Sequence, residues 1–168
     1  MPAAASSRLA NLWDDAKAAP MSEAGRLVYR SNLLGSDKRV TNYGGGNTSS
    51  KIVEKDPLTS EAVEVLWVKG SGGDLGSIQL DGFATLSLAK LQLLKGRYRG
   101  LAHEDEMAEL LAHCLFGLHT RPASIDAPLH AFIPHTFIAH LHPDAVIAVA
   151  AAREGEALTR RIYGDEVG

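Results

Sequence analysis

Two histidines separated by one residue, His140 and His142, are the feature of this sequence that most directly suggests chemistry. They stand at the end of an apolar run in the segment F-I-A-H-L-H-P-D, residues 137–144. Alternate side chains of an extended strand share one face, so both imidazoles can point at one position. Neutral imidazole suits zinc and other borderline divalent cations, and a catalytic zinc site takes three protein ligands and keeps one position open. The pair therefore predicts part of a metal site whose third ligand comes from elsewhere.

The same spacing has a plainer interpretation, in which both histidines are partly exposed polar residues where a strand leaves the core. The residues that follow favour the metal site. Pro143 cannot donate to a sheet ladder and ends the strand, and residues 144–152 (D-A-V-I-A-V-A-A-A) predict a buried helix with Asp144 near its N-terminus. The histidines then lie at a strand-to-helix junction, a common location for ligand sites in α/β proteins.

Two glycine-rich segments offer a place for a phosphate group. The first, Y-G-G-G-N-T-S-S (43–50), lets the backbone approach a ligand closely and supplies side-chain donors from Asn47 onward. The second, K-G-S-G-G-D-L-G (69–76), can form another cradle of hydroxyl and amide groups around Ser71 and Gly72. Each segment alone could be an ordinary turn. Because neither matches a nucleotide-binding pattern, the pair indicates a phosphate monoester.

A carboxylate precedes the histidine pair in the segment P-A-S-I-D-A-P-L-H, residues 122–130. Asp126 stands at the start of a short helix predicted over 125–132, where an acidic residue usually caps the helix. In the alternative interpretation Asp126 acts beside the metal, because a divalent cation polarises a substrate oxygen and a nearby carboxylate can then move a proton on the adjacent carbon. The residues alone leave both interpretations open.

The predicted elements that position these residues alternate between helices and short strands. Strands at 50–53 and 62–68 are expected to pair as a hairpin around a turn at Asp56 and Pro57. Helical patterns cover 22–34 (ended by Gly35), the second half of 83–94, 104–116, 125–132 and 144–152. This order implies an α/β fold in which helices pack against a sheet.

Length and composition narrow the class of protein. With 168 residues, of which 45% are hydrophobic, the chain is expected to form one domain with its own core. The formal net charge is −3 and the 17 lysines and arginines are scattered, so no nucleic-acid partner is expected. Cys114 is the single cysteine and lies in a helical pattern, which fits a core residue in a reducing, cytoplasmic setting. No apolar run is long enough to span a bilayer, so neither secretion nor a membrane partner is expected.

Taken in order, the motifs G-G-G-N-T-S, K-G-S-G, S-I-D-A-P-L-H and H-L-H-P-D-A resemble the class II aldolase and adducin head domain family. Within it, the likeness is greatest to the aldolase part of bifunctional rhamnulose-1-phosphate aldolase/alcohol dehydrogenases. The resemblance implies a three-layer α/β/α domain with a central mixed, mostly antiparallel sheet, in a homo-oligomer. It also implies that residues 1–168 are an incomplete N-terminal part of a longer protein, because the family's third zinc histidine lies further downstream.

The resemblance also implies roles for individual residues. His140 and His142 match two ligands of Zn²⁺ or another divalent cation, and Asp126 falls on the catalytic acid/base. That position is commonly glutamate in the family, so the shorter aspartate must approach more closely. The positions that hold the substrate phosphate correspond to Gly46, Asn47, Ser71, Gly72 and Ser124. His130 matches a further family position, where a structural role is expected.

The reaction implied by the resemblance is reversible cleavage of a ketose 1-phosphate, such as rhamnulose 1-phosphate, into dihydroxyacetone phosphate and lactaldehyde. Cleavage beside a carbonyl leaves an enediolate, whose negative charge a bound cation would stabilise. Two alternatives are a sugar-phosphate epimerase with the same metal and a non-catalytic, adducin-like binding domain. The intact histidines and carboxylate count against the second. NAD is expected only if a dehydrogenase domain follows downstream.

Overall fold

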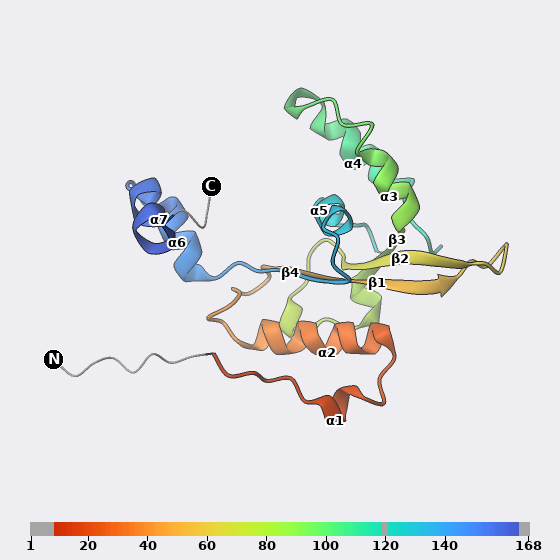
Figure 1. Ribbon diagram of the computed structural model, residues 1–168, viewed down its shortest axis with the longest axis horizontal. Helices are drawn as coiled ribbons and strands as arrows, with labels where there is room; N and C mark the ends of the chain where they lie inside the picture. The colour runs from red at the N-terminus through yellow and green to blue at the C-terminus, as the bar shows by residue number, and fades with distance from the viewer. Residues whose placement is uncertain (1–8, 119–120, 165–168) are drawn as a thin grey trace.

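The computed structural model describes residues 9–118 and 121–164, and its centre is an antiparallel sheet with the strand order β3-β2-β1-β4 (Figure 1). Helix α2 lies on one face of this sheet, and α3 and α5 lie on the other. The predicted α/β/α architecture is therefore confirmed, and every strand pair among the described residues is antiparallel. The strands are β1 (Asn47–Lys55), β2 (Ala62–Lys69), β3 (Phe83–Ser87) and β4 (Phe137–His140).

The predicted hairpin of β1 and β2 is confirmed, with Lys55 opposite Ala62 beside the turn. The Asp56 carboxylate closes this turn by accepting the backbone N–H groups of Leu58 and Thr59 at 2.8 and 2.9 Å. Strand β1 begins three residues before the predicted start at residue 50. Its polar first residues are held in the sheet because they pair with β4 on one side and, from Ser49 onward, with β2 on the other.

Most of the helices are short, and one of them ends earlier than predicted. The helix expected over 104–116 ends at Ala112, because Cys114 and Phe116 instead form backbone bonds to Ser87 and Thr85 of β3 at 2.8 and 2.9 Å. The α-helices are α1 (Asp15–Ala18), α2 (Glu23–Ser36), α3 (Leu88–Leu94), α4 (Glu104–Ala112), α5 (Ala127–Phe132), α6 (Asp144–Ala151) and α7 (Gly155–Tyr163). None of the described helices is long and apolar enough to span a membrane.

The expectation that Gly35 ends the second helix is wrong, because α2 continues to Ser36. The glycine serves close packing instead. A Cβ at Gly35 would lie only 2.0 Å from the backbone nitrogen of Gly76, in the loop that follows β2. Glycine at this position therefore lets α2 approach the second glycine-rich segment.

The core lies on both faces of the sheet. Between the sheet and helices α3, α4 and α5, the buried side chains include Leu66, Val68, Leu86, Leu91, Leu111, Cys114 and Ala131. On the opposite face a smaller cluster joins Leu27 of α2 to Ile78 and Phe83. Cys114 is a buried core residue, as its helical pattern predicted.

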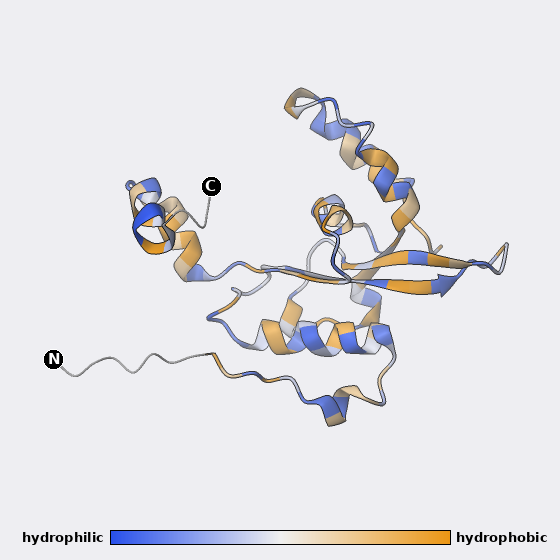
Figure 2. Ribbon diagram, viewed as in Figure 1, coloured by the Kyte–Doolittle hydropathy of each residue, from blue (hydrophilic) through white to orange (hydrophobic). Residues whose placement is uncertain are grey.

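The prediction that residues 144–152 form a buried helix is right about the helix and wrong about its burial. Helix α6 has no buried residue, and Val146 and Ile147 are 46% and 43% exposed. It packs mainly against α7, and the two helices stand apart from the sheet (Figure 2). An apolar sequence favours burial, but burial also requires another element to cover it, and among the described residues α6 is covered mainly by α7.

Candidate active site

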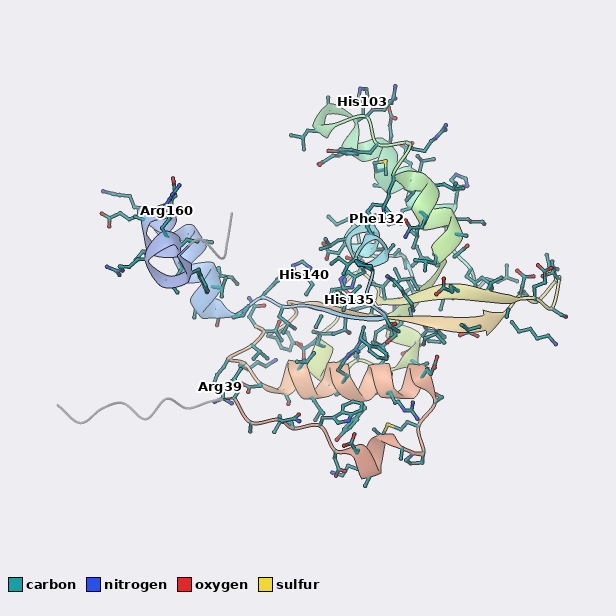
Figure 3. The ribbon with its side chains drawn as sticks, viewed as in Figure 1. Arg39, His103, Phe132, His135, His140 and Arg160 are labelled. Carbon is teal, nitrogen blue, oxygen red and sulfur yellow. The ribbon has the colours of Figure 1, made fainter. Side chains whose placement is uncertain are left out.

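The pairing of β1 with β4 sets the arrangement of the candidate site. Asn47 lies directly opposite His140, and Ser49 lies opposite Ile138. Directly paired residues in an antiparallel sheet place their side chains on the same face, so Asn47, Ser49 and His140 share one face. Helix α5 covers this face, and Figure 3 shows the His140 side chain on the α5 side of β4. The Oγ of Ser49 forms a 2.7 Å hydrogen bond with Nδ1 of His130 in α5.

The imidazoles of His140 and His142 converge at the end of β4. Their Nε2 atoms are 3.2 Å apart, and the ring planes are inclined at 70°. Two nitrogen ligands of a tetrahedral zinc ion lie about 3.3 Å apart, given Zn–N distances of about 2.0–2.1 Å. The pair therefore fits two adjacent positions around a divalent cation. The same distance fits an N–H···N hydrogen bond between neutral rings.

Asp126 lies on the other side of the His140 ring. Its Oδ2 atom is 4.0 Å from Nδ1 of His140, whereas Nε2 of that ring faces His142. The side chain of Asp126 is 36% exposed, so a ligand can reach it. The carboxylate is thus a neighbour of the histidine pair and not a third member of it.

The helix-cap interpretation of the Asp126 carboxylate does not hold. Asp126 precedes α5, but its side chain makes no capping hydrogen bond there. Its Oδ2 accepts a 3.1 Å hydrogen bond from the hydroxyl of Ser124 instead. One reason is that Pro128, early in the first turn, has no N–H for a cap to accept.

The first glycine-rich segment is tied both to the second segment and to the histidines. The N–H of Gly44 donates to Oδ1 of Asp74 at 2.9 Å, and Asp74 belongs to the second segment. Asn42 directly precedes the first segment, and its N–H donates to the carbonyl of His142 at 3.1 Å. The two segments therefore lie on the same side of the molecule as the histidine pair.

The second glycine-rich segment is tied to the stretch that carries Ser124 and Asp126. The N–H of Ser71 donates to the carbonyl of Pro122 at 3.2 Å, and Gly70 forms an isolated bridge with Ala123. Ser71 and Gly72 are exposed, whereas Gly46 and Asn47 are buried. The segments predicted to hold phosphate therefore lie close together, and the exposed donors belong mainly to the second glycine-rich segment.

Comparison with known proteins places the chain in a family. The class II aldolase and adducin N-terminal domain family matches residues 25–166. This chain belongs to that family. It is 43% identical over 158 residues to a Bacillus subtilis (strain 168) protein named "Uncharacterized oxidoreductase YuxG", a match that covers 92% of this chain and 22% of that protein. The chain therefore spans less than a quarter of this curated relative.

The fold is also shared with a solved member of the family. The structure of the N-terminal class II aldolase domain of a conserved protein from Thermoplasma acidophilum superposes with a TM-score of 0.75 at 29% sequence identity. The similarity covers 96% of this chain and 71% of the other.

In this class II aldolase family domain, His140 and His142 are the described residues whose spacing would suit two ligands of one metal ion. No three of the described His, Cys, Asp and Glu side chains lie close enough together to hold a metal ion. His140 and His142 nevertheless fit a cation by their separation and by the chemistry of imidazole. A third ligand would have to come from outside this histidine pair and its described neighbours.

Lys69, which sequence reasoning did not single out, belongs to the surroundings of Asp126. It is the last residue of β2 and only 5% exposed. Burial lowers the pKa of its ammonium group, and the charges of Asp126 and Asp74 oppose that shift. The available sequence signal was a lysine at the end of an apolar strand, where it is also the first residue of the second glycine-rich segment.

His130 lies fully buried behind the histidine pair. Its pKa is lowered to about 4, first by burial and then by His140 and Arg30, against the opposing effect of Asp126. The ring is therefore neutral at neutral pH. Its bond to Ser49 joins α5 to β1, which agrees with a structural role.

Proposed function

We propose that this domain contributes to the metal-dependent cleavage of a ketose 1-phosphate, such as rhamnulose 1-phosphate, into dihydroxyacetone phosphate and lactaldehyde. The observation that carries the proposal is the 3.2 Å separation of the Nε2 atoms of His140 and His142, with the Asp126 carboxylate on the other side of the His140 ring. Membership of the class II aldolase family supports it. When bound to the two histidines, Zn²⁺ or another divalent cation would polarise the oxygens of the substrate.

Asp126 is proposed to move the proton. In the cleavage direction, a base removes the proton from the hydroxyl group beside the breaking carbon–carbon bond, and the bonding electrons pass toward the carbonyl. An acid then returns a proton to the carbon of the phosphorylated product. The Asp126 carboxylate is partly exposed, and the hydroxyl of Ser124 fixes one of its oxygens. It is therefore accessible to substrate and held in one orientation.

The second glycine-rich segment is proposed to hold the substrate phosphate. Ser71 and Gly72 are exposed, and the φ angle of +74° at Gly72 bends the chain sharply at this point. Ser124 follows the stretch to which Ser71 is bonded, and the buried ammonium group of Lys69 adds positive charge nearby. Holding the phosphate there would fix one end of the substrate while the metal fixes the other.

The phosphate assignment is tested by comparing two ligands that differ only in the phosphate. Ser71→Ala should weaken the binding of dihydroxyacetone phosphate by about tenfold to a hundredfold, because a hydrogen bond to a charged group contributes about 1.5–3 kcal/mol. Binding of unphosphorylated dihydroxyacetone should be nearly unchanged. Thr59→Ala, in the exposed turn of the hairpin, is the matched control. Equal losses for both ligands would contradict the assignment.

The reaction itself is tested by product analysis with the full-length protein. Release of dihydroxyacetone phosphate from rhamnulose 1-phosphate is expected for a lyase, whereas an epimerase would return an isomer and release no fragment. A zinc-loaded protein that yields no dihydroxyacetone phosphate from any ketose 1-phosphate would contradict the proposal.

We further propose that the complete protein joins this domain to a nicotinamide-dependent dehydrogenase, as a homo-oligomer. The support is that the Bacillus subtilis relative bears the name of an oxidoreductase and extends well beyond the region matched by this chain. Sequencing the gene beyond Gly168 tests this directly. A downstream G-x-x-x-G-x-G segment is expected, and an open reading frame without one would contradict the proposal.

A further inference from the structure

Three buried polar atoms on the α5 side of the sheet have no hydrogen-bond partner within the described part of the protein. They are Oδ1 of Asn47, Nε2 of His130 and Nδ1 of His140. Buried polar groups are nearly always satisfied by protein or by ordered water, so a group of three unsatisfied atoms calls for a shared partner. Asn47 and His140 are direct cross-strand neighbours, and His130 is anchored over the same face by Ser49.

The spacing of the two rings suits one intervening water molecule. The ring centroids of His130 and His140 are 6.4 Å apart, with planes inclined at 44°. This separation is too long for a direct bond of about 3 Å between ring nitrogens. A single water with two hydrogen bonds of about 2.9 Å in series can join nitrogens of two rings whose centroids are this far apart.

The donors and acceptors also balance around one water. With Nε2 of His140 directed at a cation beside His142, its Nδ1 carries the hydrogen and donates. The Oδ1 of Asn47 can only accept. In the tautomer in which Nδ1–H of neutral His130 donates to Oγ of Ser49, Nε2 of that ring can accept. A water that accepts from His140 and donates to Asn47 and His130 makes three hydrogen bonds, which is typical of buried water.

We propose that one ordered water joins His130, His140 and Asn47, and that His130 acts through this water as a positioning residue. The water holds the proton of His140 on Nδ1 and keeps Nε2 directed toward the metal position beside His142. This inference rests on the proposed function, because it gives His130 a role in holding a metal ligand.

Asp126 is the competing partner for Nδ1 of His140. Its Oδ2 lies 4.0 Å away, beyond hydrogen-bond distance, and already accepts the hydroxyl of Ser124. If the carboxylate oriented the ring instead, His130 would have no influence on His140. The two arrangements therefore predict different effects of substituting His130 and Asp126.

Two substitutions of His130 separate its two nitrogens. Asparagine reproduces the position of Nδ1 and can keep the bond to Ser49, but it removes the group at Nε2. Glutamine reproduces the position of Nε2 and gives up the bond to Ser49. The experiment measures the zinc dissociation constant and the thermal midpoint of this chain with His130→Asn, His130→Gln and the control Ser49→Ala.

The proposal predicts that His130→Asn weakens zinc binding by about tenfold to a hundredfold, as is usual for the loss of a group that orients a ligand. His130→Gln should bind zinc nearly as tightly as the unchanged chain. Ser49→Ala should lower the thermal midpoint and should have little effect on the zinc affinity. A purely structural role through Ser49 predicts the reverse order, with His130→Asn the better binder. That order would overturn the proposal.

A second measurement does not depend on the metal. Nitrogen NMR of the zinc-free chain should place the proton of His140 on Nδ1 in the unchanged chain and in His130→Gln, and should show mixed tautomers in His130→Asn. An unchanged tautomer in His130→Asn, with a change in Asp126→Asn, would assign the orienting role to Asp126 and overturn the proposal. Failure of the unchanged chain to bind zinc would count against the proposed metal pair, while the tautomer result would still decide on the water.

Discussion

The carboxylate of Asp126 makes no hydrogen bond to the helix that it precedes. Substituting it can therefore separate a catalytic role from a structural one. Asp126→Asn should keep the hydrogen bond from Ser124, because the amide oxygen can accept it. Thermal stability should therefore be nearly unchanged. Turnover should fall by about a hundredfold or more, the usual contribution of general acid–base catalysis.

The control for this prediction is Asp126→Glu, which should keep part of the activity because it retains a titrating carboxyl group. Aldol cleavage rates and thermal midpoints of both variants, measured in the full-length protein, provide the comparison. Undiminished turnover in the asparagine variant would show that the proton is moved by another group.

His130 predicts a pH dependence of stability. Its pKa falls from 6.5 to about 4 on folding, chiefly through burial. Between these values the unfolded chain binds a proton that the folded chain does not, so the free energy of unfolding must decrease as the pH falls. The loss should reach roughly 3 kcal/mol once the pH is below both values. Urea unfolding of the metal-free chain and of His130→Gln should show a flatter profile in the variant between pH 6.5 and 4, and superimposable profiles would contradict the assignment.

The sequence predicted the contacts that local spacing determines. Two histidines one residue apart at the end of a strand were expected to converge, and their nitrogens lie 3.2 Å apart. The environment of Lys69 was not predictable in this way. The charges that act on its ammonium group belong to Asp74 and Asp126, and Asp126 is far away in sequence and is brought close only by folding.

The two glycine-rich segments use glycine for different reasons. Gly46 has a φ angle of +78°, and a Cβ there would lie 2.8 Å from Oγ1 of Thr41 and 2.9 Å from Cδ1 of Leu75. Gly72 has a φ angle of +74°, but a Cβ there would meet nothing within 4 Å. The first position therefore combines backbone strain with a steric clash, whereas the second has only the backbone strain.

Substitution by alanine should separate these two effects. Gly72→Ala should destabilise the fold by about 1–2 kcal/mol, the strain of a left-handed backbone conformation in a residue with a Cβ. Gly46→Ala should cost a further 1–3 kcal/mol or so, because the added methyl group overpacks a closed space. Urea unfolding of both variants provides the measurement, and equal losses would contradict this account.

The elements that follow from local patterns were predicted well, whereas those that depend on distant contacts were not. The hairpin of β1 and β2 follows from β-branched residues on either side of an Asp-Pro turn. Gly35 looked like a helix stop, yet it lies inside α2 because its neighbour is the backbone of Gly76, which no local pattern reveals. The early end of α4 likewise depends on backbone bonds to β3.

Helices α6 and α7 form a unit that is much less buried than the sheet. No residue of either helix is buried, whereas Val65, Leu66 and Val68 of β2 are fully buried. Regions with few buried apolar contacts open more readily than the core. The amide hydrogens of α6 should therefore exchange with solvent much faster than those of β2.

Hydrogen exchange followed by mass spectrometry, at two protein concentrations, tests this prediction. Protection of α6 equal to that of β2 at both concentrations would contradict the arrangement. Protection that rises with concentration would instead show that a second copy covers the helix. The apolar run 144–152 predicted burial from composition alone, and the exposed state of α6 shows why composition is insufficient: burial depends on which other surface meets the helix.

Zinc titration of the purified chain tests whether His140 and His142 bind one divalent cation together. The unchanged chain is compared with the double variant His140→Ala/His142→Ala and with His135→Ala, a control on an exposed histidine at the other end of β4 (Figure 3). We predict one zinc ion per chain, bound equally by the unchanged chain and by the control, and loss of most of the affinity in the double variant. Equal zinc binding by the unchanged chain and the double variant would contradict the assignment.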